Sequence, residues 1–148
     1  MEKFDQSYIE MAGVWARNSY CRRRQVGALL VKDRMIISDG YNGTPSGFEN
    51  NCEDENGVTK PYVLHAEANA IISASRDKMI GSSLFLVGIE VDDGSYVQKA
   101  SCCSMCKRQV INAGIEKVYI RDTKDEYRVV NVSEWIDDDE SLEGLKGY

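Results

Sequence analysis

The sequence predicts an α/β fold in which helices flank a central mixed sheet of about five strands. Two observations lead to this prediction. Apolar runs of strand length interleave with segments whose apolar residues recur at helical spacing, and the last two strand-like runs stand too close together to be parallel. A chain of 148 residues is the usual size of one domain. We expect a single domain over residues 1–148, with residues 133–148 as an acidic C-terminal tail.

The first half of the chain is expected to form a helix, a hairpin and a long loop. A helix over about residues 4–19 is predicted by apolar side chains at helical spacing, namely Phe4, Tyr8, Met11, Ala12 and Trp15. The runs QVGALLV and RMIISDGYN, which meet around Lys32 and Asp33, predict a β-hairpin of two buried strands. The stretch from Tyr41 to about Tyr62 is rich in Gly, Pro, Asn and Ser, and it is too long to be a mere connection.

The second half is expected to alternate between helices and strands. Helices are predicted over about residues 65–78 and over SMCKRQVINAG, which Gly114 closes, and the acidic tail is expected to add a last short helix. Strands are predicted for LFLVGIEV, for SYVQKAS after a turn, and for KVYIR and YRVVNV. Only seven residues, Arg121 to Tyr127, separate KVYI from RVVNV. A parallel crossover needs about a dozen residues or more, so these two strands should pair antiparallel.

Charge is distributed unevenly along the chain. The net charge is −6, but residues 133–148 carry six acids against one lysine, so the body of the chain is nearly neutral. The concentrated cationic segment is Arg22-Arg23-Arg24, which can hold one phosphate monoester but is a thin basis for a polynucleotide track. We therefore expect no nucleic-acid partner.

The chain is expected to be a soluble cytoplasmic protein with no membrane partner. The N-terminal stretch MEKFDQSYIEMAG carries acids and no apolar run, and the sequence nowhere approaches the ~18 consecutive apolar residues of a membrane-spanning helix. In a reducing compartment, clustered cysteines indicate a metal site or catalysis more often than disulfides. No disulfide framework is therefore expected among the five cysteines, of which Cys21 and Cys52 stand alone while Cys102, Cys103 and Cys106 are bunched.

His65 and the Cys103–Cys106 pair form a candidate set of zinc ligands. Cys-x-x-Cys at the start of a helix lets two thiolates converge on one metal, and the helix dipole favours the anionic sulfur. Structural zinc sites are closed by four protein ligands, whereas catalytic ones keep a position open for water. The chain contains one histidine, so the ligand count favours one catalytic zinc per chain. The same shortage leaves Cys21 and Cys52 without a histidine to complete a second zinc site.

Glu67 lies two residues after this histidine, where it can approach the zinc-bound water without ligating the metal. Zinc lowers the pKa of its bound water toward ~7, and a carboxylate beside that water can move its proton to a ring nitrogen and a leaving amine. Taken singly, a histidine at a helix start is usually a cap or a surface residue, and Cys-x-x-Cys could be half a structural clip or a redox pair. Together with Glu67, the two motifs favour catalysis.

The sequences His65-Ala66-Glu67 and Cys103-Ser104-Met105-Cys106 resemble the motifs of zinc-dependent deaminases, although Cys102 stands where the family has proline. Over roughly residues 5–120, the segments CRRRQVGA, GYNGTPSG, HAEANAI and NAGI resemble the cytidine and deoxycytidylate deaminase family, in particular its deoxycytidylate members. The resemblance implies a three-layer αβα fold and hydrolytic deamination of dCMP to dUMP, with release of ammonia after zinc-bound hydroxide attacks cytosine C4. The short connection after KVYIR departs from the crossover helix of deoxycytidylate deaminases, so substrate contacts from that helix are not carried over.

The resemblance also implies roles for individual residues. Glu67 would shuttle protons, and zinc would be held by His65, Cys103 and Cys106. Substrate binding is implied for Asn42, at the sugar, and for Arg22, Arg23 and Arg24, at the phosphate. On the residues alone, Asn42-Gly43 could equally be a plain turn and the arginines a solvated patch.

Regulation and assembly are further implications of the resemblance. Arg76 matches a helix arginine that the family links to effector response, although an exposed helix arginine is the commoner case. The resemblance implies a homo-oligomer, with a hexamer favoured, and regulation by dCTP and dTTP together with Mg²⁺. Three alternatives stay open. The chain could deaminate another substrate (cytidine, deoxycytidine, CMP, guanine or a tRNA base), could be a non-catalytic structural zinc protein, or could be a polynucleotide editor, which the acidic tail disfavours.

Overall fold

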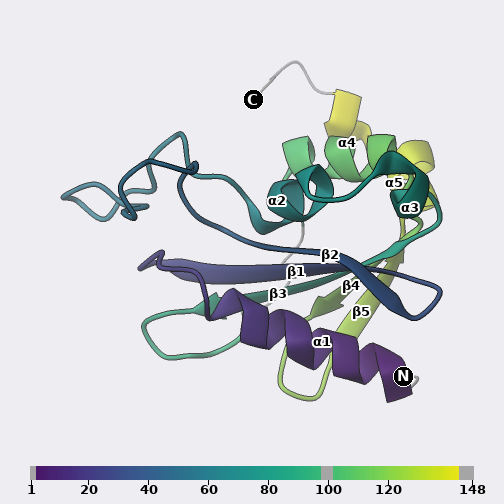
Figure 1. The fold of residues 1–148 in the computed structure, drawn as a ribbon, viewed down its shortest axis with the longest axis horizontal. Helices are drawn as coiled ribbons and strands as arrows, with labels where there is room; N and C mark the ends of the chain where they lie inside the picture. Colours follow the sequence, from purple (N-terminus) through teal and green to yellow (C-terminus); the bar gives the residue numbers. More distant parts are fainter. Residues whose placement is uncertain (1–2, 98–101, 144–148) are drawn as a thin grey trace.

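The computed structural model describes residues 3–97 and 102–143, which form a five-stranded sheet between two layers of helix (Figure 1). The helix α1 lies on one face of the sheet, and the helices α2 to α5 lie on the other. In chain order the elements are α1 (Lys3–Ala16), β1 (Arg24–Lys32), β2 (Met35–Tyr41), α2 (Ala66–Ile72), α3 (Arg76–Met79), β3 (Ser83–Glu90), α4 (Ser104–Ala113), β4 (Lys117–Arg121), β5 (Tyr127–Asn131), α5 (Val132–Asp138) and the 3-10 helix η1 (Glu140–Glu143). The predicted three-layer fold with a five-stranded sheet is confirmed.

The sheet is mixed, with the strand order β2-β1-β3-β4-β5. The hairpin β1–β2 and the pair β1–β3 are antiparallel, and β3 pairs parallel with β4. The strands β4 and β5 are antiparallel, with Lys117 opposite Asn131 and Arg121 opposite Tyr127. The prediction drawn from the short connection between them is therefore confirmed.

Successive side chains of the central strands point to opposite faces of the sheet and build a hydrophobic core on each face. In β1, Leu29 and Val31 face α1, whereas Ala28 and Leu30 face the layer that contains α2 and α4. The close approach of α1 depends on Gly27, because a Cβ there would lie 2.2 Å from the Ala12 carbonyl oxygen. Gly27 therefore lets α1 pack directly against β1.

Two predicted elements differ from the structure. The helix predicted over residues 65–78 is broken into α2 and α3, and the Ser73 hydroxyl donates to the Asn69 carbonyl oxygen at 2.8 Å where α2 ends. Serine hydroxyls compete in this way with helical hydrogen bonds, and the sequence has no Gly or Pro there to signal a break. Of the predicted strand SYVQKAS, the described residues 95–97 include one isolated bridge, between Tyr96 and Ile89, and residues 98–101 lie outside the described part of the chain.

The acidic C-terminal segment contributes to the core as far as it is described. The predicted last helix is α5, which buries Val132 and Trp135 against the α2–α4 side of the sheet. The following residues contact α4, where Asp139 accepts from Lys107 Nζ at 2.8 Å. None of the helices in the described ranges is long and apolar enough to cross a membrane.

Cys21 and Cys52 form a disulfide, which contradicts the expectation that no disulfide is present. Both cysteines are buried, and a sequence separation of 31 hid their proximity. The disulfide ties the segment before β1 to the long loop between β2 and α2. That loop extends beyond the end of the sheet in Figure 1.

Candidate active site

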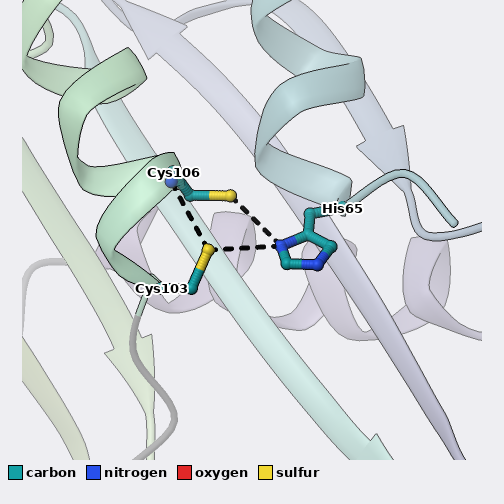
Figure 2. Close-up of side chains that lie close together, drawn as sticks. All are labelled: His65, Cys103 and Cys106. Atoms are coloured by element: carbon teal, nitrogen blue, oxygen red, sulfur yellow. Dashed lines mark hydrogen bonds between the residues drawn. The ribbon is translucent and has the colours of Figure 1, made fainter. Parts of the chain in front are cut away.

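Two helix N-termini bring His65, Cys103 and Cys106 together on one side of the sheet (Figure 2). His65 immediately precedes α2, Cys103 immediately precedes α4, and Cys106 lies in the first turn of α4. The His65 Nδ1 atom lies 3.2 Å from Cys106 Sγ and 3.5 Å from Cys103 Sγ. One nitrogen and two sulfur atoms therefore converge within 4.8 Å of one another.

The start of α4 positions the Cys103 sulfur. The Cys103 sulfur caps the helix by accepting from the Cys106 N–H at 3.4 Å, so it lies at the positive end of the helix dipole. The opposite end of α4 is closed as predicted by Gly114, which adopts a left-handed conformation with φ 82°.

The position of His65 is fixed by the packing of α2 on β2. A Cβ at Gly40 would lie 2.5 Å from the Ala66 carbonyl oxygen and 2.6 Å from the Ala70 nitrogen, so only glycine lets the helix come this close. The Asn69 amide donates to the Tyr41 carbonyl oxygen at 2.9 Å, which adds a side-chain tie between the same two elements. The histidine is therefore placed by a helix that has little freedom to shift.

Glu67 lies beside this donor cluster and is buried, with only 5% of its surface exposed. Its carboxylate is close enough to the thiols of Cys102 and Cys106 to influence the pKa of both. The pKa of each of these two thiols is raised well above the usual range for cysteine. Burial is the largest cause, and the negative charge of Glu67 is the second. Cys102 faces Glu67 and is not one of the three converging donors among the described residues.

This donor set fits zinc. Imidazole nitrogen and cysteine sulfur are zinc's preferred ligands, and three of them leave a coordination position open. A divalent cation would also offset the cost of placing a buried carboxylate beside sulfur ligands that must lose their protons to bind it. The arrangement can thus activate a water molecule next to a buried base.

A second cluster, made of Cys21, Cys52 and Glu53, also places its donor atoms within 4.8 Å of one another. The disulfide removes both thiolates as ligands. The Glu53 carboxylate is occupied as well, because it accepts hydrogen bonds from Arg22 and Arg23. This cluster holds the loop in place rather than presenting a metal site.

The long loop is anchored at both of its ends, and one end leads directly into His65. Gly43 and Leu64 exchange backbone hydrogen bonds of 3.1 and 2.8 Å. Asn42 accepts from the Val26 N–H at 2.8 Å and donates to the Arg24 carbonyl oxygen at 2.9 Å. The Asn42 amide keeps one N–H and one oxygen lone pair for a ligand, and the residue borders a hollow of about 90 Å³.

The three adjacent arginines differ in what they contact. The Arg22 guanidinium donates to Glu53 at 3.3 Å, and the Arg24 guanidinium donates to Glu90 at 2.9 Å. The Arg23 side chain makes no ion pair or hydrogen bond within residues 3–97 and 102–143, and it borders the same hollow as Asn42. On sequence alone the three arginines are equivalent and Glu53 gives no signal, because an acid in a polar loop carries no motif.

Arg76 is the first residue of α3 and is exposed. Its guanidinium makes no ion pair within the described ranges, and it is not among the residues of the donor cluster or the hollow beside Asn42.

Residues 2–121 match the family model for the cytidine and deoxycytidylate deaminase zinc-binding region. The deoxycytidylate deaminase of Mycobacterium phage D29 is 31% identical over 129 residues, which cover 78% of this chain and 91% of the phage protein. The deoxycytidylate deaminase of Schizosaccharomyces pombe is also 31% identical, but the match covers only 36% of that longer protein.

Among solved structures, the fold is similar to that of the dCMP deaminase from the cyanophage S-TIM5, crystallised in complex with dCMP and dUMP. The TM-score is 0.67 at 38% sequence identity, and the match covers 82% of this chain and 83% of the cyanophage protein. The similarity therefore covers most of both chains.

Proposed function

The chain belongs to the cytidine and deoxycytidylate deaminase family, and from that membership we propose that it hydrolyses dCMP to dUMP and ammonia. One observation carries the proposal. A buried glutamate, Glu67, lies beside three convergent zinc donors, in a chain 38% identical to a cyanophage dCMP deaminase. A structural zinc clip has no use for that buried carboxylate.

We propose that His65, Cys103 and Cys106 hold one zinc ion per chain. When bound, zinc supplies the Lewis acidity that makes a water molecule nucleophilic at neutral pH. The chain's own contribution is to fix two of the three donors at the start of α4 and the third at the start of α2. Each donor is thus held by a helix that packs on the sheet.

Glu67 is assigned the proton transfers. Its carboxylate takes a proton from the attacking water while the water oxygen bonds to cytosine C4, and it returns that proton to the ring nitrogen N3. A second transfer, from the hydroxyl at C4 through Glu67 to the amino group, accompanies cleavage of the C4–N bond and release of ammonia. Burial of Glu67 keeps bulk water from competing for these protons.

For the rest of the nucleotide, we assign Asn42 to the sugar and Arg23 to the phosphate. The Asn42 amide keeps one donor and one acceptor beyond its two backbone contacts. Arg23 is favoured over its neighbours because the guanidinium groups of Arg22 and Arg24 are already paired with carboxylates. A nucleotide bound in this way would span the loop and the donor cluster.

We further propose that the chain is a single domain that forms a cytoplasmic homo-oligomer, with a hexamer favoured, and responds to dCTP and dTTP with Mg²⁺, with Arg76 as a candidate effector residue. These assignments follow from family resemblance. Light scattering of the purified protein tests the hexamer, and dCMP saturation curves with each effector test the regulation. Parent-like regulation in an Arg76→Ala variant would remove Arg76 from the proposal.

Ammonia release from dCMP, CMP, deoxycytidine, guanine and single-stranded DNA tests the substrate assignment. We expect dCMP to give the highest kcat/KM. A parent enzyme that prefers deoxycytidine would be a nucleoside deaminase, and turnover of none of the five would favour a structural zinc protein.

A further inference from the structure

Glu53 is a buried acid in the long loop, with only 3% of its surface exposed. Its two carboxylate oxygens accept from the Arg22 N–H at 3.1 and 3.0 Å and from the Arg23 N–H at 3.2 Å. The Arg22 guanidinium adds a third donor at 3.3 Å. A single side chain thus fixes the backbone of two successive arginines, 30 and 31 residues away in sequence.

The turn that Glu53 holds is next to the region assigned to the nucleotide's sugar and phosphate. Two hollows share Arg23 and Glu53 in their walls, and one of them is also bordered by Asn42. Because Glu53 engages Arg22 and Glu90 engages Arg24, Arg23 keeps its guanidinium available.

We infer that Glu53 is a positioning residue for recognition of the substrate phosphate, acting through Arg23. This inference rests on the proposed function. Glu53 fixes the Arg22–Arg23 backbone and keeps Arg22 turned toward the loop, so that Arg23 alone of that pair reaches the phosphate. A preorganised guanidinium loses less conformational entropy when it binds an anion than a freely moving one does.

A carboxylate is suited to this role in a way that an amide is not. Both oxygens of Glu53 are acceptors, so it can serve two backbone N–H groups and one guanidinium at once. A glutamine in its place would turn an NH₂ group toward one of these donors and leave that contact unmade.

The direction in which dCMP binding changes when the charge of Glu53 is removed distinguishes a positioning role from simple charge repulsion. A carboxylate near a phosphate is repulsive, so removing its charge should improve dCMP binding if Glu53 were only a nearby anion. Positioning predicts the opposite, because Arg23 would lose its fixed backbone.

Steady-state kinetics of Glu53→Gln with dCMP and with deoxycytidine test the inference. We expect the KM for dCMP to rise about tenfold with kcat unchanged, and kcat/KM for deoxycytidine to stay within about twofold of the parent. The matched control is Glu55→Gln, an exposed acid two residues away, which should leave the KM for dCMP unchanged or slightly lower.

A double-mutant cycle with Arg23→Ala tests the route of the effect. If Glu53 acts through Arg23, Glu53→Gln should add little to the loss already caused by Arg23→Ala. Additive losses, an unchanged KM for dCMP or equal losses on both substrates would each overturn the inference.

The experiment keeps the two proposals distinguishable. A parent that prefers deoxycytidine contradicts the proposed function, whereas a parent that prefers dCMP with an unaltered Glu53→Gln variant contradicts only the role of Glu53. If Glu53→Gln does not fold, Glu53→Asp retains both acceptor oxygens on a shorter arm. Its KM for dCMP should then rise by less than tenfold, and a parental value would overturn the inference.

Discussion

The zinc-donor cluster and the arginine turn beside the long loop are built in contrasting ways. The cluster lies at the starts of α2 and α4, whose buried faces belong to one hydrophobic core. The turn at Arg22 and Arg23 lies outside regular structure and is held by the Cys21–Cys52 disulfide and by the single carboxylate of Glu53. Under the proposed function, catalysis would rest on packed helices, and substrate selection would rest on a few polar and covalent ties.

This contrast separates two kinds of substitution. Changes at the donor cluster should affect every substrate, because they remove metal or proton transfer. Changes at the turn should affect only substrates that carry a phosphate.

Loss of a zinc donor should have the largest effect. Cys106→Ala leaves two donors for the metal, so we expect less than a tenth of an equivalent of zinc and no detectable deamination of dCMP or deoxycytidine. Metal analysis measures the zinc content, and ammonia release measures the deamination. The control is Cys102→Ala, which should keep its zinc because Cys102 is not one of the converging donors in the described residues. Full zinc content in Cys106→Ala would show that the ligands have been misassigned.

Loss of the phosphate contact should have the next largest effect. Arg23→Ala should lower kcat/KM for dCMP by about 10- to 100-fold, because a charged hydrogen bond contributes roughly 1.5–3 kcal/mol, and it should leave deoxycytidine almost unchanged. Arg24→Ala removes a neighbouring guanidinium that already pairs with Glu90 and should have a smaller effect. A larger loss in Arg24→Ala than in Arg23→Ala would transfer the phosphate contact to Arg24.

The donor cluster could be predicted from the sequence, whereas the support of the turn could not. Cys103 and Cys106 are three residues apart, and the single histidine leaves little choice of partner. Glu53 and Cys52, by contrast, lie about 30 residues from the arginine turn and meet it only through the path of a long loop. Their type and spacing give no signal. The expectation that no disulfide forms rests on a reducing compartment, a general tendency that does not decide the state of one buried cysteine pair.

A variant that lacks the disulfide tests whether the turn at Arg22 and Arg23 stabilises the protein independently of the donor cluster. Cys52→Ser should lower the free energy of unfolding by about 2–4 kcal/mol, the usual effect of losing a native disulfide, and a reducing agent should have the same effect on the parent. Thermal unfolding measures the change. Zinc should stay close to one equivalent in the variant. A fall from two equivalents to one would instead show that Cys21 and Cys52 bind metal.

The smallest effect is expected where the C-terminal segment contacts the first half of α4. Asp139→Asn removes the ion pair with Lys107, in which both side chains are about 20% exposed, and should cost about 1 kcal/mol of stability or less. Zinc content and substrate preference should not change, because neither region depends on this pair. A loss of zinc in Asp139→Asn would show that the C-terminal segment supports the donor cluster.

The proposal that Glu67 is the proton shuttle beside a zinc site is tested most directly by turnover and zinc content, measured on the same preparations of the parent and of Glu67→Gln. We expect close to one equivalent of zinc in both proteins. The kcat for dCMP should be lower by about 10²–10⁴-fold or more in the variant, because one residue serves several proton transfers. A variant that keeps its zinc and deaminates dCMP within a few-fold of the parent would contradict the assignment of Glu67 as the proton shuttle.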